Sequence, residues 1–392
     1  MINFDFAIKT KLYFGSGKHL ETGKILSEYN VKKLIIVIGQ GSVKSTGLLD
    51  EVVSTIKKHG IDYKVLEGVR PNPTVQLVRE FISTAREYEP DFVLAIGGGS
   101  VIDSAKLMCV GYYYEGDCFD FNLGIAVPKK ALPLGVILTI AASGSEMSVS
   151  SVVQDDERMI KRGFLHELNR PVFAIENPEL TYSVSLTQTA YGIVDIMMHT
   201  LERYFQPSSE NEPADGFAEA LLKAVIKAGR IVMKNPKDYE SRAVLMLMSS
   251  LSHNGLTNIG KPFFLPVHQF EHALSGLYPE VAHGAGLAVL FPSWARYYIP
   301  YDTDKFDQLA RNVFDLHNEN KTENAYKGID ALEDFFEYLK MPHSFKDLGI
   351  DNPDIDKLVS VLMAGKEEKG IPHHKKPINL ENARIIYENC LR

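Results

Sequence analysis

This 392-residue sequence has three cysteines, a single tryptophan and no long apolar run. The cysteines, Cys109, Cys118 and Cys390, cannot all pair within one chain and lack zinc-finger spacing, so we expect reduced thiols. The longest apolar stretches, such as Leu134 to Ala142, are too short to cross a bilayer. The first residues show no basic region followed by an apolar stretch and a cleavage site. A cytoplasmic protein is therefore expected.

The sequence also lacks an excess of positive charge. Its 42 lysines and arginines are outnumbered by 50 aspartates and glutamates, which gives a formal net charge of −8. Nucleic acids and acidic membrane surfaces are approached through basic patches, so neither is expected as a partner. Hydrophobic residues make up 45% of the chain, an ordinary share that argues against disorder. The length favours two domains, because it exceeds the size at which one core keeps growing.

The first half of the sequence alternates short apolar runs with amphipathic stretches. The runs are rich in Ile, Val and Leu, as in a parallel sheet covered on both faces, and lie at 32–39, 63–69, 91–99, 132–140 and 171–177. Helical apolar spacing occupies 48–59, 75–88 and 101–113. This order predicts a doubly wound α/β domain. Ahead of it, FDFAIKTKLYF predicts an extended or hairpin lead-in.

After about residue 180 the strand pattern stops. Long helical patterns follow at 185–205, 212–234, 241–252 and 283–298, with shorter amphipathic ones up to Leu391. The Asn177-Pro178 pair marks the expected boundary, so we predict an α/β domain over 1–180 and a helical domain over 181–392. A cleft between two closely packed domains is the expected place for a functional site.

A glycine-rich turn, IGGGSVIDSAK (96–106), follows a strong strand pattern and opens a helix. Its glycines let the backbone turn tightly and approach a ligand. Ser100 is expected to cap the helix, with Asp103 in capping-box spacing. The exposed amides and the positive end of the helix dipole then suit a pyrophosphate. The spacing differs from the GxGxxG fingerprint of dinucleotide-binding proteins, so a turn without a ligand is the alternative.

Two more turns follow strand patterns in the same way, GQGSVKSTG (39–47) and TIAASGSE (139–146). Ligands of open α/β sheets bind beyond the carboxyl ends of the strands, where all three turns would gather. Although each alone is consistent with a plain loop, three turns rich in small and hydroxyl residues favour a shared nucleotide site. The candidate cofactor residues are Gly39, Gln40, Gly41, Ser42, Lys44, Gly97, Gly98, Gly99, Ser100, Asp103, Thr139, Ala142 and Ser143.

A candidate metal site begins in AYGIVDIMMHTLERYF (190–205). Asp195 and His199 lie four residues apart, on one face of a helix, and Glu202 continues that face. The surrounding residues are mostly apolar, and a buried carboxylate is costly unless it is paired or bound to a metal. Taken alone, the segment favours a structural hydrogen bond between Asp195 and His199.

The segment LPVHQFEHALSGLYPEVAHGAGLAVLF (265–291) adds three of the chain's 12 histidines within 16 positions: His268, His272 and His283. One carboxylate and several imidazoles suit a divalent transition metal such as iron or zinc, and ligand type alone does not separate the two. Spacing alone allows His268 with His272, one helical turn apart, as readily as a set that includes His283. A purely structural zinc site is the alternative, but nearby glycines and a nucleotide site favour a reactive metal.

Together these motifs resemble the iron-containing alcohol dehydrogenases, and specifically the branch of butanol dehydrogenases and broad aldehyde reductases. The resemblance runs over essentially the whole chain. It is carried by NFDFAIKTKLYFG, GQGSVKSTG, AIGGGSVIDSAK, TIAASGSEMS, GIVDIMMHTLERYF, SLSHNGL and HQFEHALSGLYPEVAHGAGLA. The glycine turn is only moderately specific, whereas the ordered set is highly specific. Gln40 departs from the pattern, since a glycine is common there.

The resemblance implies a Rossmann-like dinucleotide-binding domain and an all-α metal-binding and substrate domain, the fold shared with dehydroquinate synthase-like proteins. It implies an NAD(P)- and metal-dependent alcohol dehydrogenase or aldehyde reductase for small primary alcohols and aldehydes such as butanol and butanal. A homodimer is also expected. The implied ligands of one divalent ion, Fe²⁺ or Zn²⁺, are Asp195, His199, His268 and His283. His272 is implied to lie near the nicotinamide and to orient or relay a proton, and Lys161 joins the cofactor contacts.

The loop at 39–47 predicts that NADP(H) is preferred over NAD(H). NAD-preferring enzymes usually place a carboxylate there, and its charge repels the 2′-phosphate of NADP. From Gly39 onward the first acid is Asp50, beyond the loop, and Lys44 offers a positive charge that suits a phosphate. The alternative is a loop that tolerates either cofactor, with Lys44 pointing into solvent.

The sequence leaves two alternative functions. A related fold performs metal- and nicotinamide-dependent ring closure or reduction of phosphorylated sugars, which would make the protein a lyase or a polyol-phosphate dehydrogenase. That chemistry requires Lys and Arg around a substrate phosphate, whereas 255–267 offers only Lys261 among apolar residues. The second alternative is a protein that binds metal or nucleotide without catalysis.

Overall fold

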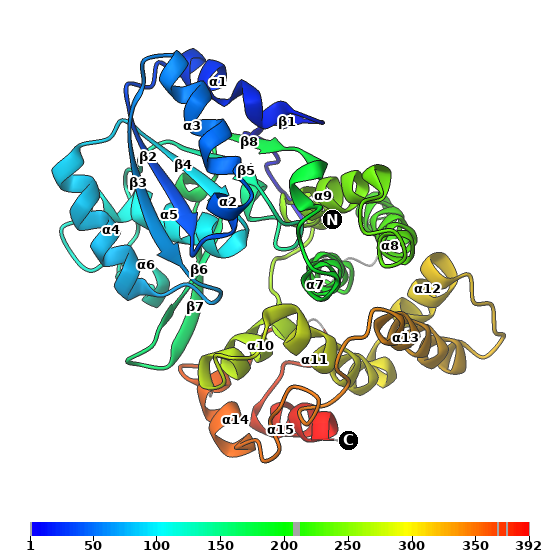
Figure 1. Cartoon of the computed structure of the whole chain (residues 1–392). Helices are drawn as coiled ribbons and strands as arrows, with labels where there is room; N and C mark the ends of the chain where they lie inside the picture. The colour runs from blue at the N-terminus through cyan, green and yellow to red at the C-terminus, as the bar shows by residue number, and fades with distance from the viewer. Residues whose placement is uncertain (1, 207–211, 367, 374, 392) are drawn as a thin grey trace. The chain divides into compact units, whose positions relative to one another are not determined.

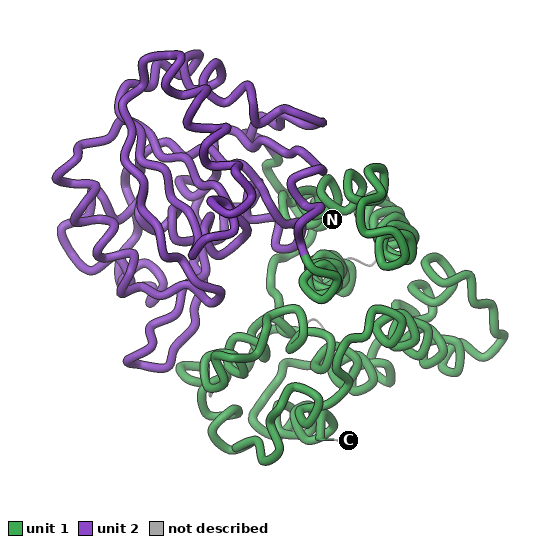
Figure 2. Tube along the Cα trace, in the orientation of Figure 1, with its two compact units in different colours: residues 1–6, 185–392 green, residues 7–184 purple. Residues whose placement is uncertain are grey.

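The computed structural model describes residues 2–206, 212–366, 368–373 and 375–391. Backbone contacts divide the chain into two compact units (Figure 2). One is Ala7–Val184 and the other combines Met1–Phe6 with Ser185–Arg392. The first unit contains a parallel sheet and the second is built from helices, so the fold class expected from the sequence is confirmed. The domain bounds 1–180 and 181–392 stay a prediction.

Six parallel strands form the sheet of the α/β unit, in the order β1-β8-β5-β4-β2-β3 (Figure 1). Their bounds are β1 Lys11–Phe14, β2 Lys33–Gly39, β3 Asp62–Val69, β4 Phe92–Gly97, β5 Leu134–Leu138 and β8 Phe173–Glu176. All five apolar runs expected to be strands are strands. In chain order, β3 lies on one side of β2 and β4 on the other, so the strand order reverses at the β2–β4 pair. Open α/β sheets bind ligands at such a reversal.

Helices cover both faces of this sheet. On one face α1 (Thr22–Glu28) and α3 (Leu48–Lys58) pack on alternate strand residues such as Ile36. The neighbouring residue Val37 points to the other face and is also fully buried, while α4 (Val75–Tyr88) and α5 (Gly99–Gly111) pack against β3 and β4. The remaining helices of the unit are α2 Ser42–Ser45, α6 Asp120–Leu123, η1 Lys18–Glu21, η2 Ser145–Met147, η3 Glu167–Asn169 and η4 Pro178–Thr181.

Two features of this unit differ from expectation. The hairpin considered for the lead-in is wrong, because β1 pairs in parallel with β8 at the edge of the sheet. In addition, β6 (Ser150–Asp155) and β7 (Ile160–Leu165) form an antiparallel hairpin that the sequence analysis did not anticipate. Their polar and charged residues break the continuous apolar pattern of the buried strands, and a two-stranded ribbon needs no such pattern.

The second unit consists of helices joined by loops. Their bounds are α7 Leu186–Tyr204, α8 Glu212–Val232, α9 Tyr239–His253, η5 Leu256–Asn258, α10 Pro266–Leu277, α11 His283–Tyr298, η6 Ile299–Tyr301, α12 Thr303–Phe314, α13 Lys321–Tyr338, α14 Ile355–Met363, α15 Leu380–Glu388 and η7 Asn389–Leu391. The four long helices expected here are confirmed to within about two residues. No described helix is both long and apolar enough to span a membrane.

Helix α7 lies at the centre of this unit and packs against α8, α9 and α11. Ser185 caps it, because its hydroxyl accepts a hydrogen bond from the backbone N–H of Gln188 at 3.2 Å. Helix α11 carries Trp294, which is buried against Phe291 and Phe306. Because helices pack around α7, residues on nearly every side of it are buried. The polar side chains of α7 therefore lie inside the unit.

Candidate active site

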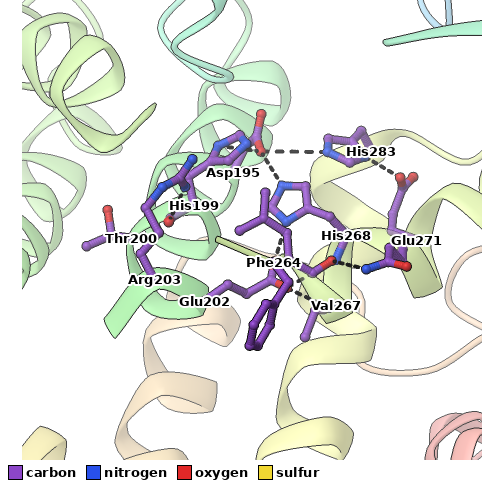
Figure 3. Close-up of polar contacts among 12 residues, drawn as sticks. Asp195, His199, Thr200, Glu202, Arg203, Phe264, Val267, His268, Glu271 and His283 are labelled. Atoms are coloured by element: carbon purple, nitrogen blue, oxygen red, sulfur yellow. Dashed lines mark hydrogen bonds and ion pairs between the residues drawn. The ribbon is translucent and has the colours of Figure 1, made fainter. Parts of the chain in front are cut away.

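Three histidines converge on Asp195 within the helical unit (Figure 3). Asp195 Oδ1 lies 3.3 Å from His199 Nδ1, 3.6 Å from His268 Nε2 and 3.7 Å from His283 Nε2. Asp195 and His199 come from α7, His268 from α10, and His283 is the first residue of α11. The structure thus brings together all four residues that the resemblance implies as metal ligands.

Their donor atoms fit a shared divalent ion. Asp195 Oδ1, His199 Nδ1 and His268 Nε2 are buried, and no residue that the structure describes hydrogen-bonds to them. Buried polar atoms without a partner are costly and are rare in native proteins. Donors about 2.1 Å from one tetrahedral ion lie about 3.4 Å apart, which is close to the observed 3.3–3.7 Å. The side chain of His283 is 27% exposed, so the group opens on that side.

Two further carboxylates, not assigned a role from the sequence, hold the histidines from behind. Glu202 contacts Nδ1 of His268, and Glu271 contacts Nδ1 of His283 (Figure 3). Glu202 Oε1 also accepts the backbone N–H of Val267 at 2.6 Å, in the first turn of α10, where N–H groups have no partner within the helix. A carboxylate at Nδ1 leaves the Nε2 lone pair for a metal.

The charges around this group also favour a divalent cation. With the imidazoles counted as neutral, the three buried carboxylates Asp195, Glu202 and Glu271 and the one buried guanidinium of Arg203 leave a formal balance of −2. The Arg203 guanidinium donates to the backbone carbonyl of His199 at 2.5 Å. Burial lowers the pKa of Arg203 to about 10, so the guanidinium remains charged at neutral pH. A net buried charge of this size requires compensation.

The protonation of the two most buried histidines differs. Burial, followed by the positive charge of neighbouring His253, holds the pKa of His199 well below its ordinary value, so its ring is neutral. Burial alone would lower the pKa of His268 as well, but the negative charges of Glu202 and Asp195 outweigh it and raise the pKa to about 9. A divalent ion competes with that proton for the same ring, and binding would release it.

Two other imidazoles lie next to this group. The ring centre of His272, on α10, is 5.8 Å from that of His283 and 6.4 Å from that of His268. The rings of His199 and His253 are 4.1 Å apart, and His253, at the end of α9, was not singled out from the sequence. Only its place in the SLSHNGL motif hinted at a role.

A glycine allows α11 to approach α7 closely enough for His283 to reach Asp195. A Cβ on Gly284 would lie 2.4 Å from the backbone carbonyl oxygen of Tyr191, one turn before Asp195 on α7. No side chain larger than hydrogen fits there without moving one helix. The glycine after His283 is therefore required for the close approach of His283 to Asp195.

The three turns expected to bind the cofactor gather at the carboxyl ends of β2, β4 and β5, as predicted. A Cβ on Gly98 would lie 2.3 Å from Ile140, and one on Gly99 would lie 2.4 Å from Ser143 Oγ. The backbone N–H of Thr139 donates to the carbonyl of Gly97 at 3.1 Å. The glycines therefore let the turn after β4 pack directly on the turn after β5.

The candidate cofactor residues occupy these turns and their flanks. At the end of β2 lie Gly39, Gln40 and Gly41, followed by Ser42 and Lys44 in α2. At the end of β4 lie Gly97 and Gly98, the N-cap of α5, followed by Gly99, Ser100 and Asp103 in α5. After β5 come Thr139, Ala142 and Ser143, and Lys161 lies in β7. Helix α5 begins directly after β4, next to the point where the strand order reverses, and its first amide groups are expected to bind a pyrophosphate there.

The expected capping box of α5 is wrong. Gly98 is the N-cap, and no side chain caps the helix. Asp103 instead accepts hydrogen bonds from Ser145 Oγ at 2.6 Å and from the backbone N–H of Val152 at 3.1 Å. These partners come from the turn after β5 and from β6, and they draw the Asp103 carboxylate away from the helix end.

Lys106, to which the sequence analysis gave no role, holds the same turn. Its ammonium is fully buried and donates to Ser145 Oγ at 2.8 Å, to the Ser148 carbonyl at 3.1 Å and to the Ser150 carbonyl at 2.7 Å. Burial lowers its pKa to about 8. Lys106 and Asp103 together fasten the segment after β5 to α5, and the part-exposed Ser143 lies at its edge.

Two basic side chains lie at the margins of the cofactor turns. Lys44 forms an ion pair with Glu67 of β3, an acid that lies outside the 39–47 loop and was therefore missed. Both side chains are about half exposed, at 48% and 55%. Lys161 donates to Asn72 Oδ1 at 3.0 Å, which connects the β6–β7 hairpin to the loop after β3. The three cysteines are free and buried, as thiols.

Comparisons with known proteins agree with this geometry. The model of the family described as iron-containing alcohol dehydrogenase matches residues 9–178, and that of the Fe-containing alcohol dehydrogenase family, C-terminal, matches 189–391. The chain is 38% identical over 390 residues to NADH-dependent butanol dehydrogenase A of Clostridium acetobutylicum, with 99% of each chain covered. It is 30% identical over 393 residues to the NADPH-dependent aldehyde reductase YqhD of Escherichia coli, again with 99% of each covered.

Solved structures give the same result. NADH-dependent butanol dehydrogenase A of Thermotoga maritima matches with a TM-score of 0.95 at 34% identity, covering 100% of this chain and 99% of that one. Fold and site thus define a metal- and nicotinamide-dependent oxidoreductase. The chain belongs to the iron-containing alcohol dehydrogenase family. It interconverts alcohols and aldehydes and uses a nicotinamide cofactor and a divalent metal.

Proposed function

We propose that this enzyme reduces small aliphatic aldehydes such as butanal and oxidises the corresponding primary alcohols. The proposed ligands of its single divalent ion, Fe²⁺ or Zn²⁺, are Asp195, His199, His268 and His283. The observation that carries the proposal is the convergence of three imidazole nitrogens on Asp195 Oδ1 at 3.3–3.7 Å, in a group that is part-exposed only at His283. The names of several relatives, butanol dehydrogenases and an aldehyde reductase, support the substrate class.

The chain's own residues would divide the work in the following way. A bound divalent ion supplies Lewis-acid polarisation of the substrate oxygen. Glu202 and Glu271 orient the imidazoles, and the neutral ring of His199 offers its Nδ1 lone pair. His272, whose ring centre is 5.8 Å from that of His283, orients or relays the proton that the alcohol oxygen gains or loses. The amides at the start of α5 hold the cofactor pyrophosphate.

We propose that NADP(H) is preferred over NAD(H), because Lys44 supplies a positive charge at the end of β2 and no acid lies within the loop itself. The ion pair of Lys44 with Glu67 favours the second candidate, a preference for NADH, because the carboxylate partly neutralises that charge. The related butanol dehydrogenases of Clostridium acetobutylicum are named as NADH-dependent, which points the same way, whereas YqhD is named as NADPH-dependent. Catalytic efficiency measured with both cofactors at equal ionic strength decides between the two.

The alternative function, action on phosphorylated sugars, would need Lys261 to bind the substrate phosphate. Lys261 is buried and its ammonium lies 2.5 Å from Asp215, while it also donates to the backbone carbonyls of Arg203 and Tyr204 at the end of α7. All of these partners are structural, so the ammonium is engaged within the helical unit. This arrangement supports a substrate without a phosphate group.

The proposal is tested with a substrate panel on protein reconstituted separately with ferrous iron and with zinc. Absorbance at the nicotinamide band follows turnover of butanal, longer aldehydes and phosphorylated sugars. Metal-free protein is the control for each substrate. We expect turnover of short aldehydes that depends on the metal. Turnover of the phosphorylated sugars alone, or equal rates with and without metal, contradicts the proposal.

A homodimer and a cytoplasmic location remain part of the proposal. The strand β1 lies at one end of the strand order, so its outer edge suits pairing with another copy. The mass of the particle in solution, measured by light scattering, tests the dimer. A monomer at micromolar concentration contradicts it.

A further inference from the structure

Glu271 is the buried acid that directly precedes the candidate proton-relay histidine in the sequence, and its carboxylate lies against His283. Its side chain, on α10, is fully buried and contacts Nδ1 of His283 on α11 (Figure 3). Burying a carboxylate costs free energy unless a partner compensates for it. The partner here is His283, a candidate metal ligand. The buried Glu271 carboxylate is therefore compensated only while His283 keeps its position.

A carboxylate lies against Nδ1 of two candidate ligands, as a hydrogen bond at His268 and as an ion pair at His283. Glu202 contacts Nδ1 of His268 from α7, as Glu271 contacts Nδ1 of His283. Both rings then direct Nε2 toward Asp195 Oδ1, at 3.6 and 3.7 Å. A carboxylate that accepts the Nδ1–H fixes the ring's tautomer and orientation, and leaves the Nε2 lone pair for the ion. His199 differs, because its Nδ1 faces Asp195.

The position of Glu271 is itself determined by close packing. A Cβ on Gly286, three residues after His283 on α11, would lie 3.0 Å from Glu271 Cγ and 3.4 Å from Leu274 Cδ2. Because Gly286 has no side chain, the methylene groups of Glu271 can pack directly against α11. A side chain locked by packing in this way holds its partner more precisely than a mobile one.

We propose that Glu271 is a positioning residue of the metal site: it fixes the tautomer and the rotation of His283, so that Nε2 is presented to the ion beside Asp195. This inference rests on the proposed ligand set, in which His283 is a ligand. It assigns Glu271 no direct bond to the metal. The rival arrangement is that Glu271 and His272 are ligands themselves, since their ligand atoms and that of His283 lie within 4.8 Å of one another.

The test measures zinc affinity of the full chain, not turnover. Zinc-loaded protein is titrated with a chromophoric chelator, and dissociation constants are compared for wild type, Glu271→Leu, Glu271→Gln, Gly286→Ala, His283→Ala and His272→Ala. We expect Glu271→Leu to weaken binding by about 10- to 100-fold, as is typical of lost outer-shell partners. Glu271→Gln should lose less, because its amide oxygen still accepts the Nδ1–H.

Gly286→Ala changes neither the Glu271 side chain nor any of the proposed metal ligands. Alanine is a better helix former than glycine, so the substitution should not weaken α11 itself. We therefore expect it to lower zinc affinity only by displacing Glu271. Circular dichroism and thermal unfolding of the zinc-free proteins check that each variant is folded, and this variant replaces Glu271→Leu should the latter fail to fold.

A double-mutant cycle distinguishes orientation from general packing. In a His283→Ala background, Glu271→Gln should cause no further loss of zinc affinity, because the ring to be oriented is gone. Wild-type affinity in both Glu271→Leu and Gly286→Ala overturns the proposal, as does an additive loss in the double variant. Loss of zinc in both Glu271→Gln and His272→Ala makes these residues ligands instead. Wild-type affinity in His283→Ala refutes the ligand set itself, which is a separate result.

Discussion

Replacing Gly284 with alanine should disable the metal site without touching any ligand. Gly284 is the second residue of α11, and a Cβ there would lie 2.4 Å from the backbone carbonyl oxygen of Tyr191 and 2.8 Å from its carbonyl carbon. These atoms belong to the backbone of α7 and cannot rotate away. The start of α11 must therefore move away from α7, and His283 moves with it.

The size of the effect follows from these distances. The contact to Tyr191 must lengthen by at least 0.6 Å to reach 3.0 Å, a limit below which Cβ contacts are essentially never found. Binding groups need to be held within about 0.5 Å of their working geometry. The separation of His283 Nε2 and Asp195 Oδ1, now 3.7 Å, would grow accordingly. We expect zinc affinity to fall by about 10- to 100-fold.

Stability of the metal-free protein should change much less. Overpacking costs about 1–3 kcal/mol, and the better helix propensity of alanine offsets about 1 kcal/mol of that. The matched control is Gly216→Ala on α8, where a Cβ would meet no atom within 4 Å. Zinc affinity is measured by chelator competition and unfolding by circular dichroism. Zinc affinity of Gly284→Ala within a factor of two of both wild type and the control would refute the reasoning.

Four further results are expected. His272→Ala should keep one metal per chain, by elemental analysis, while kcat falls by orders of magnitude; loss of the metal would place His272 among the ligands. Gly99→Ala, whose Cβ would lie 2.4 Å from Ser143 Oγ, should weaken cofactor binding about tenfold in calorimetry, and unchanged affinity would separate the turn from the cofactor. Lys44→Ala should raise the KM for NADPH and barely change that for NADH, whereas Glu67→Gln should lower the KM for NADPH; the opposite pattern contradicts the role given to the ion pair. Removal of the metal should lower the free energy of unfolding by about 2.7 kcal/mol relative to protein held at a hundredfold excess over its Kd, and an unchanged melting temperature would contradict a site bound only in the folded state.

The fold was largely predictable because its main signals are local. β2, β4, β5 and β8 are buried on both faces, so their sequences are nearly continuous runs of apolar residues. The β6–β7 hairpin escaped prediction because it is a two-stranded ribbon in which no residue of β7 is fully buried and Lys161 and Arg162 are charged. The parallel pairing of β1 with β8 joins residues about 160 positions apart, and no local pattern encodes a partner at that distance.

The candidate site was predictable where the proposed ligands share an element and less so where they do not. Asp195 and His199 lie one helical turn apart on α7, which spacing revealed at once. The pairing of His268 with His283 depends on the break between α10 and α11, so spacing left it open beside His272. Glu271 and Glu67 were missed for the same reason, because each meets its partner on another element.

Trp294, the only tryptophan of the chain, makes the helical unit optically distinct from the α/β unit. It is 1% exposed on α11, the helix that begins with His283. Selective excitation of tryptophan therefore reports the unfolding of the helical unit alone, whereas far-UV circular dichroism reports both. Coincident melting curves from the two signals would indicate one cooperative transition. A fluorescence change that occurs at its own temperature would assign that step to the helices that carry the metal site.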